Sequence, residues 1–514
     1  MVMRSLWTAS CIVLALCASA AEAAPKRAVS DEARTAAYLD TIAGSPPRLR
    51  MFLQRMPKGG DLHNHSGGAI YAEDLLRWAG DDGLCIATDT HRIVAKPADQ
   101  KACDAPNRIP ATGLERDYPR YSHMIDALST RGFESGVGDP ETSGYDRFFA
   151  TFGAFWPAAM GNEAKSLSLT RAQAAADRVS YVELGSGSGA MATLAGRLGD
   201  TRDVDANDFA GMLARLTPLL PAAVAQARAE YDGFDAELAR IDGCATATPK
   251  PGCGVEMRYL YTAIRTVPAA QVFAQLAFGF ALVSADARFV GVNIAAPEHD
   301  PVAVRDYALH MRMIAFLKAR YPKVALSLHA GELTLGLVPP RELAFHIRDA
   351  VEVAGARRIG HGIDISYERD AAGLLKRMAR DRVAVEINLT SNAVILGVKG
   401  AAHPLSLYRE AGVPVVLSTD DEGVSRSDMT NEYVRAVTEQ GLRYADLKQI
   451  VRDGLQYSFL PGASIWDDRA GGAKVVACRV VGAAACEAFV AGSGKAARQV
   501  ALERDLAAFE AEAR

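Results

Sequence analysis

The feature that most constrains the fold is an alternation of short apolar runs, rich in β-branched residues, with longer runs of helical periodicity. The short runs lie at residues 59–65, 178–185, 256–264, 288–295, 323–330, 357–362, 382–390 and 413–421. Helical stretches such as residues 304–321 lie between most of them. A strand followed by a helix, repeated eight times, predicts a (β/α)8 barrel of the TIM type, with an open doubly wound sheet as the alternative.

The connection between the first two predicted strands, residues 66–177, is far longer than a barrel needs. We predict a long helical insertion here, with an aromatic helix at residues 145–156 and a polar loop from Cys85 to Cys103. An aromatic stripe is usually core packing, but above a barrel mouth it can also wall an apolar pocket. The Gly/Ala-rich residues 466–514 are expected to form a C-terminal helical extension of the same domain.

Composition indicates a globular chain that acts on small molecules. Close to half of the residues are hydrophobic, which suffices for a large core, and the formal net charge is -4. No long basic run is present, so we expect no nucleic-acid partner and no attraction to anionic membranes. The oligomeric state cannot be predicted from the sequence.

The first residues have the pattern of a signal peptide. Arg4 precedes an apolar run, and Ala21-Glu22-Ala23 offers a cleavage site, so residues 1–23 predict export to the periplasm or medium with no stable membrane insertion after cleavage. A lipoprotein anchored at Cys17 is the alternative, but Leu16 stands where a small residue is expected. A helical segment at 24–55 should precede the barrel at 56–465.

The remaining cysteines form three couples that are local in sequence: Cys85 and Cys103, Cys244 and Cys253, and Cys478 and Cys486. Each couple lies in a polar or Gly/Pro/Ala-rich stretch, which favours loop-closing disulfides in an oxidising compartment. Buried free thiols are the alternative. A cysteine-ligated zinc is disfavoured because the chain has no C-x-x-C motif.

Four residues at the ends of predicted strands form a candidate metal site. His63 and His65 lie two apart on the first strand, so both point to one face. His329 ends the fifth strand and Asp420 the eighth, which gives three nitrogen ligands and one oxygen ligand, a set that suits one zinc ion per chain. Each residue alone also has an ordinary explanation as a surface or satisfied core residue.

Further polar residues follow the same strand ends: Glu332, His361, Asp421, Ser391 and Asn392. Tandem aspartates and single histidines are often no more than caps or core residues. Ionisable clusters at several strand ends of one barrel would be costly unless they are paired or metal-bound. Their joint placement favours a metallohydrolase site at the barrel mouth.

The stretches "MPKGGDLHNHSGG", "SLHAGE", "RIGHG", "TSN" and "STDDEG" occur in this order between residues 56 and 457. In combination they resemble the adenosine deaminase family of metal-dependent amidohydrolases, which includes the exported adenosine deaminase-related growth factors. The signal peptide, the cysteine loops and the tail lie outside the resemblance. The H-x-E and P-C-x-x-C motifs of the cytidine-type zinc deaminases are absent from the sequence.

The resemblance implies zinc-dependent deamination of adenosine or 2'-deoxyadenosine to the inosine product and ammonia, with His63, His65, His329 and Asp420 as zinc ligands. Glu332 is expected to protonate the purine ring nitrogen. His361 is expected to orient the zinc-bound water and take its proton, and Asp421 to hydrogen-bond the water and the purine.

Three positions depart from the family pattern. Ala296 replaces a glycine whose backbone N–H is expected to meet the purine, and Gly67 replaces an aspartate expected to hold the ribose 5'-hydroxyl. Glu422 replaces a proline after the paired aspartates. All three should bear on which substrate fits, together with His65 and Asp421 in the binding site.

Two other functions compete with nucleoside deamination. One is a related amidohydrolase that acts on another 6-aminopurine, a 5'-modified adenosine, or an amide or ester. The other is a secreted binding or signalling protein on the same fold. The complete acid/base set argues against a pure binder, because binding does not require a buried acid beside a metal.

Overall fold

The computed structural model describes residues 29–95, 103, 105–133, 143–191, 194, 205–467 and 469–512. The predicted signal peptide at residues 1–23 lies outside these ranges.

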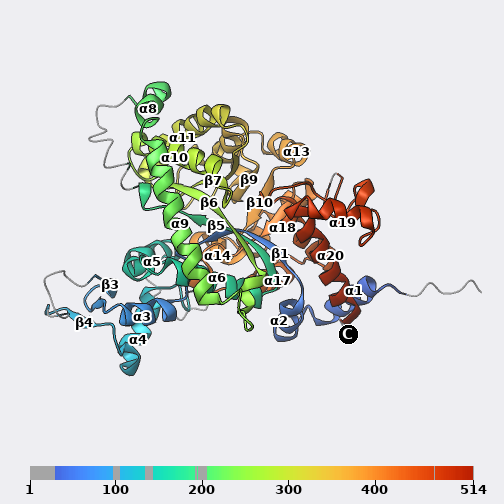
Figure 1. The fold of residues 1–514 in the computed structure, drawn as a ribbon, viewed down its shortest axis with the longest axis horizontal. Coiled ribbons are helices and arrows are strands. Elements are labelled where there is room, and N and C mark those ends of the chain that lie inside the picture. Colours follow the sequence, from blue (N-terminus) through green and yellow to red (C-terminus); the bar gives the residue numbers. More distant parts are fainter. Residues whose placement is uncertain are drawn as a thin grey trace, which may run out of the picture.

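Eight parallel strands form the centre of the molecule (Figure 1). They are β1 (Gly59–His65), β5 (Val179–Ser186), β6 (Glu256–Ile264), β7 (Phe289–Ala295), β8 (Ala325–Ala330), β9 (Arg358–His361), β10 (Ala384–Ile387) and β11 (Val415–Leu417). Each strand pairs with the next in chain order. Beyond β11, the Asp420 N–H donates to the His63 carbonyl at 2.8 Å, and the His65 N–H donates to the Asp420 carbonyl at 3.1 Å. The two ends of the sheet therefore meet, which confirms the predicted (β/α)8 barrel and excludes the open sheet.

The last two strands are shorter than the sequence predicts. The run at residues 382–390 yields β10 only as far as Ile387, because α14 (Leu389–Leu396) begins two residues later. The Thr390 N–H donates to the buried carboxylate of Glu432 at 3.1 Å. This partner is 42 residues away, so no local pattern could indicate that the chain leaves the strand there.

Helices surround the barrel and cover its apolar outer face (Figure 1). They are α8 (Phe209–Leu216), α9 (Leu220–Asp242), α10 (Ala269–Ala285), α11 (Pro301–Arg320), α12 (His346–Asp349), α13 (Ala371–Asp381), α15 (Leu405–Glu410), α16 (Glu422–Ser425), α17 (Met429–Thr438) and α18 (Tyr444–Gln456). Helix α10 is apolar on almost every side because it packs against β6 and β7 on one face and against α8, α9 and α11 on the others.

The insertion after β1 contains both helices and a small sheet. Its elements are α3 (Ala72–Asp81), β2 (Cys85–Ala87), β3 (Arg92–Val94), β4 (Arg108–Pro110), α4 (Tyr118–Ala127), α5 (Gly144–Ala159) and α6 (Glu163–Ala176). Strands β2, β3 and β4 form an antiparallel sheet, where the sequence predicted only a polar loop. Ile86 and Ile93 are buried in a cluster with the insertion helices. The helical insertion itself is confirmed, including the aromatic helix α5.

Both ends of the described chain pack against the barrel near the start of β1. Helices α1 (Asp31–Ile42), α18 and α20 (Gly494–Glu512) contact one another, with α2 (Pro46–Arg55) and α19 (Ala484–Ala491) beside them. Lys448 on α18 pairs with Glu510 on α20 at 2.6 Å. Gly59 adopts φ +68°, and a Cβ there would lie 2.5 Å from the Val451 carbonyl oxygen. Glycine therefore lets β1 begin in close contact with α18.

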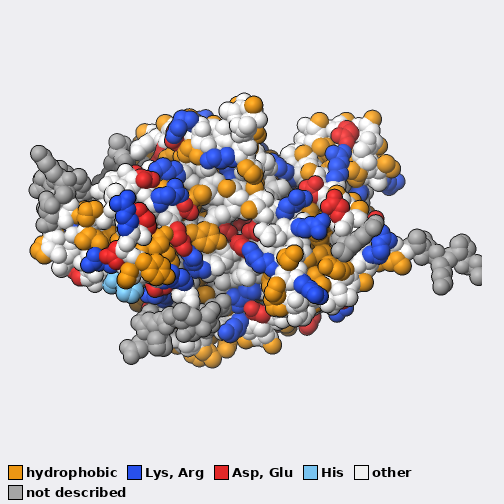
Figure 2. Space-filling view, turned by 90° about the horizontal axis from the view of Figure 1, so that it is seen from below, with side chains coloured by type: hydrophobic (Ala, Val, Ile, Leu, Met, Phe, Trp, Pro, Cys, Tyr) orange, Lys and Arg blue, Asp and Glu red, His pale blue; other side chains and the backbone are white. Residues whose placement is uncertain are grey.

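All three predicted disulfides are present: Cys85–Cys103, Cys244–Cys253 and Cys478–Cys486. Figure 2 shows basic and acidic side chains interspersed on one face of the molecule, with hydrophobic patches between them. Within the described ranges, no helix combines the length and the apolar character needed to cross a bilayer.

Candidate active site

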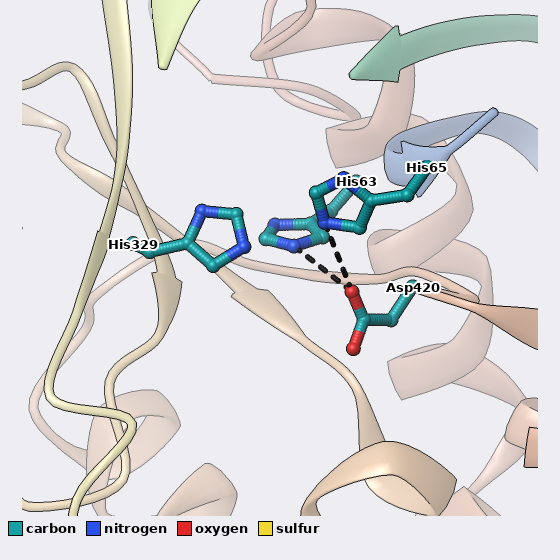
Figure 3. Close-up of side chains that lie close together, drawn as sticks. All are labelled: His63, His65, His329 and Asp420. Carbon is teal, nitrogen blue, oxygen red and sulfur yellow. Dashed lines mark ion pairs between the residues drawn. The ribbon is translucent and has the colours of Figure 1, made fainter. Parts of the chain in front are cut away.

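Four side chains from three strand ends point toward one another at the barrel mouth (Figure 3). They are His63 and His65 from β1, His329 from β8, and Asp420 just after β11. The Oδ1 atom of Asp420 lies 3.3 Å from Nε2 of His63 and 3.2 Å from Nε2 of His65. One ligand atom from each of the four residues lies within 4.8 Å of all the others. The structure thus brings the predicted ligand set together.

The hydrogen bonds around these residues suit a metal. Nδ1 of His63 lies 2.7 Å from Glu386 and Nδ1 of His329 lies 3.0 Å from Asn293, which leaves Nε2 of both rings for the centre of the cluster. Nε2 of His63 is buried and has no hydrogen-bond partner among the described residues. The separations from Asp420 match the spacing of about 3.3 Å that tetrahedral zinc bonds of 2.0–2.1 Å require. These residues therefore fit a zinc ion.

The partners that orient the histidine ligands escaped the sequence analysis. Glu386 lies in the middle of β10 and contacts both Ser327, at 2.7 Å, and Arg358. Burial opposes its charge, but Arg358, His63 and Ser327 together outweigh burial and hold the pKa of Glu386 at about 2. A carboxylate on the second nitrogen of a ligand histidine fixes its tautomer and raises its basicity. The signal that could have found Glu386 is a charged residue inside the apolar run "VAVEINL".

Asp420 is oriented by a residue that the sequence did single out. Ser391 on α14 donates to Oδ2 of Asp420 at 2.5 Å, so Oδ1 remains for the histidines. Burial alone would raise the pKa of Asp420, but the adjacent His63 and His65 imidazoles hold it well below its ordinary value. The carboxylate is therefore in the charged form that a metal needs.

Glu332 lies buried next to the ligand cluster, three residues beyond His329. Burial and the charge of Asp420 raise the pKa of Glu332 to about 8. Its backbone N–H and that of Gly331 donate to Glu298 at 2.9 Å and 3.0 Å. Gly331 adopts φ +77°, and a Cβ there would lie 2.4 Å from Asp364. The turn after β8 thus presents a carboxyl group that stays protonated at neutral pH.

His361 and Asp421 complete the polar end of the site. Burial lowers the pKa of His361 to about 3, so its ring is neutral. Burial and the neighbouring Asp420 charge raise the pKa of Asp421 well above its ordinary value. Oδ1 of Asp421 is buried without a hydrogen-bond partner among the described residues. A Cβ at Gly68 would lie 1.6 Å from this atom, so glycine is required there.

These residues open into a cavity of about 840 Å³. Its inner end is lined by His65, His329, Glu332, His361, Asp420 and Asp421. Its outer wall comes largely from α5, through Phe148, Phe149, Phe152 and Trp156. Trp156 is 51% exposed and lies at the rim. The described lining residues include Glu163 and Glu230 but no Lys or Arg.

The three departures from the family pattern fall in different places. Gly67 and Ala296 line the cavity, but Glu422 is buried on α16 and does not line it. Glu422 therefore has no direct contact with the cavity through which it could affect substrate fit, contrary to what the sequence had led us to expect. Ala296 adopts φ +87°, a conformation that favours glycine. The space beside Gly67 is taken by Trp156, whose ring lies 3.4 Å from where a Cβ would be.

Comparison with known proteins gives one family. The adenosine deaminase family model matches residues 227–465, which include β6 to β11 but not the histidines of β1. An adenosine deaminase of Shewanella loihica is 34% identical over 146 residues, which cover 28% of this chain and 41% of the relative. An adenosine deaminase of Escherichia coli is 34% identical over 146 residues and is covered to 40%. The matched segment thus spans about two fifths of these relatives.

Among solved structures, the apo form of the N6-methyl-AMP deaminase from Arabidopsis thaliana is similar, with a TM-score of 0.49 and 17% identity over 80% of this chain and 94% of that one. The family assignment rests on the sequence matches instead. Residues 227–465 of this chain match the adenosine deaminase family model, and the curated relatives support membership of that family.

Proposed function

We propose that the protein hydrolyses the 6-amino group of a purine nucleoside at a zinc centre, converting adenosine or 2'-deoxyadenosine to the inosine product and ammonia. The observation that carries this proposal is the buried, protonated Glu332 beside four convergent metal ligands. A metal site alone serves many hydrolases. A carboxylic acid kept neutral at its side supplies the proton that attack on a purine ring requires.

His63, His65, His329 and Asp420 would hold the zinc ion. When bound, zinc lowers the pKa of a coordinated water from 15.7 to about 7 and so supplies a nucleophile at neutral pH. Glu332 donates its proton to the ring nitrogen next to the carbon under attack, which makes that carbon more electrophilic. The oxygen of water adds to the carbon, one water proton passes to the amino group and the other restores the Glu332 carboxyl group. The carbon–nitrogen bond then breaks, and the amino group leaves as ammonia.

Asp421 and His361 face the same end of the cavity and would contact the attacking oxygen. Asp421 has a free carboxylate oxygen for a hydrogen bond with the water or the purine. Ala296 would offer its backbone N–H to the purine, as its place in the cavity lining allows. His65 and Gly67 line the same cavity, so both would contact the bound substrate.

The charge of the cavity supports a nucleoside over a nucleotide. A phosphate group is normally recognised by Arg, Lys or a helix N-terminus. The described lining residues supply no Arg or Lys, and they include Glu163 and Glu230. A phosphorylated substrate would bring its negative charge near these carboxyl groups, so we expect it to be a poor substrate.

The outer wall also supports a second candidate, a nucleoside modified at the 5' position. The family pattern places a carboxylate at position 67, but this chain has glycine with the Trp156 ring packed beside it. An indole ring offers apolar contact and no acceptor for a hydroxyl group. A 5'-deoxy or other apolar 5' group would therefore fit where the family pattern provides for a hydroxyl.

We also propose that the protein is exported to the periplasm or medium. The signal-peptide pattern of residues 1–23 and three disulfides support this, because such bonds form and persist in oxidising compartments. Purified exported protein should begin near Ala24 and contain no titratable thiol. Six titratable thiols in the native protein would contradict the proposal.

One assay tests the activity. Purified protein is incubated with adenosine, 2'-deoxyadenosine, 5'-deoxyadenosine, adenine and AMP, ammonia release is measured, and bound metal is determined on the same sample. We expect release from the nucleosides and about one zinc per chain. Glu332→Gln is the matched variant, since it keeps shape and metal but cannot donate a proton. Absence of ammonia from all five compounds would overturn the proposal.

A further inference from the structure

A buried histidine outside the cavity leads by hydrogen bonds to His361. His403 lies between α14 and α15 and is not among the residues that line the cavity. The Leu405 backbone N–H donates to Nδ1 of His403 at 3.1 Å. A backbone N–H can only donate, so Nδ1 of His403 carries no proton. Burial lowers the pKa of His403 to about 4, so the neutral ring has its proton on Nε2.

The proton on His403 fixes the orientation of an amide. Nε2 of His403 lies 3.2 Å from Oδ1 of Asn392 on α14. Since this nitrogen is a donor, the atom that faces it must be the amide oxygen rather than the amide nitrogen. The Leu405 backbone N–H can only donate, so it fixes, through His403, the orientation of the Asn392 amide.

The orientation of Asn392 in turn determines what His361 meets. Nδ2 of Asn392 lies 2.9 Å from Nδ1 of His361, and Nδ2 of Asn388 lies 3.3 Å from the same atom. Amide nitrogens donate and do not accept, so Nδ1 of His361 is the acceptor. Oε1 of Glu332 is 3.6 Å from Nδ1, which is too far for a hydrogen bond that would compete.

We propose that His403 is a positioning residue that acts through Asn392 to hold His361 in the tautomer with its proton on Nε2. His361 then meets the attacking oxygen as a hydrogen-bond donor. This deepens the proposed function and rests on it. It differs from the role that the family resemblance implies, in which His361 takes a proton from the water, because Nδ1 is the only nitrogen left to accept one and faces Asn392.

The tautomer can be observed directly in the resting protein. Protonated and unprotonated imidazole nitrogens have well separated ¹⁵N chemical shifts, so zinc-loaded protein labelled with ¹⁵N-histidine reports which nitrogen of His361 carries the proton. His361→Gln assigns the signals. We expect Nε2 to be protonated and Nδ1 to be unprotonated in the wild-type protein.

Two substitutions change the hydrogen bonds in opposite ways. Asn392→Asp offers only acceptors, so it should accept from both rings and move the His361 proton to Nδ1. His403→Phe removes the group that fixes the amide, so Asn392 can turn and both tautomers of His361 should appear. In each variant kcat should fall on the order of 10-fold or more while KM changes little, because a misplaced donor affects the reacting state.

Rescue and control variants separate positioning from packing. His403→Gln keeps an amide N–H near the position of Nε2 and should restore the wild-type tautomer and most of kcat. His310, buried in α11 with no hydrogen-bond partner for its ring among the described residues, provides the matched control. His310→Phe should leave the His361 signals unchanged. If His403→Phe does not fold, Asn392→Asp still tests the proposal.

The outcomes are distinct from those of the proposed function. A protonated Nδ1 on His361 in wild-type protein would overturn the inference even if the protein deaminates adenosine. An unchanged tautomer and kcat in Asn392→Asp would also overturn it. An inactive wild-type protein with Nε2 protonated would instead overturn the proposed function and leave the hydrogen-bond chain in place.

Discussion

The two ends of the cavity come from different parts of the chain and use opposite chemistry. The inner end is made by residues at the strand ends of the barrel, and its ionisable side chains are mostly buried. The outer end is walled by α5 from the insertion after β1, through apolar rings that are partly exposed at the rim. The proposed reaction belongs to the first region, and the choice of substrate belongs to the second.

The difference has a physical basis. A side chain on a barrel strand is held by neighbouring strands on both sides, so a metal ligand or acid keeps its place to within the precision that catalysis needs. A helix in an insertion can change its side chains without disturbing the barrel. Substitutions at the inner end should therefore abolish activity, and substitutions at the outer end should redistribute it among substrates.

The largest effect should come from His63→Ala, at the centre of the inner end. Loss of one of four ligands should remove the metal, and the deaminase activity should fall to background. Metal content by elemental analysis and ammonia release check this together. Phe149→Ala, at the outer wall, is the control and should keep its zinc. Full activity in metal-free protein would contradict the assignment of the inner end as a catalytic metal site.

Glu332→Gln should have the next largest effect. The amide preserves the shape but has no acidic proton, so kcat should fall by roughly 100-fold or more while zinc content and nucleoside affinity are kept. Steady-state kinetics and equilibrium binding of inosine measure the two parts. A variant with near-normal kcat would remove Glu332 from the reaction.

The pH dependence of kcat should reflect the titration of Glu332. Burial raises the pKa of Glu332 to about 8, so the acid form that donates the proton is present below this pH and is lost as the pH rises through it. We expect kcat to fall roughly 10-fold per pH unit above about pH 8. Glu332→Gln should lack this decline. An identical decline in the variant would assign it to another group.

The next prediction concerns the outer wall. Because Gly67 provides no carboxylate and Trp156 fills the space beside it, 5'-deoxyadenosine should be deaminated within about tenfold of adenosine in kcat/KM. Gly67→Asp should shift this ratio toward adenosine by roughly 10- to 150-fold, since a hydrogen bond to a charged group contributes about 1.5–3 kcal/mol. A hundredfold preference for adenosine in wild-type protein would show that another residue binds the hydroxyl.

The smallest effect on activity should come from the Cys244–Cys253 disulfide, which lies after α9 and does not line the cavity. Replacing both cysteines by serine frees a short loop in the unfolded chain and should lower the free energy of unfolding by about 2.5 kcal/mol. The value of kcat should not change. Urea unfolding measures the first effect, and a large loss of kcat would show that the loop contributes to the site.

The sequence predicts the inner end better than the outer end. His63 and His65 alternate on one strand, so their common direction follows from local geometry. The sheet formed by β2, β3 and β4 was not predicted, because each strand has only three residues. Glu386 and His403 were also missed, since Glu386 meets a partner 323 residues away in the chain and His403 acts through Asn392. Contacts of this kind depend on the closed barrel.

The closure of the barrel at Asp420 links metal binding to the stability of the sheet. The last strand reaches the first through a single bridge between Asn64 and Asp420, and the side chain of Asp420 faces two histidines of the opposite strand. A cation bound there would hold together the seam of the barrel, which is the junction between β1 and the residues after β11. Chelation should therefore let the seam open locally before the rest unfolds, and the amide hydrogens of His65 and Asp420 should be the first in the sheet to exchange with solvent.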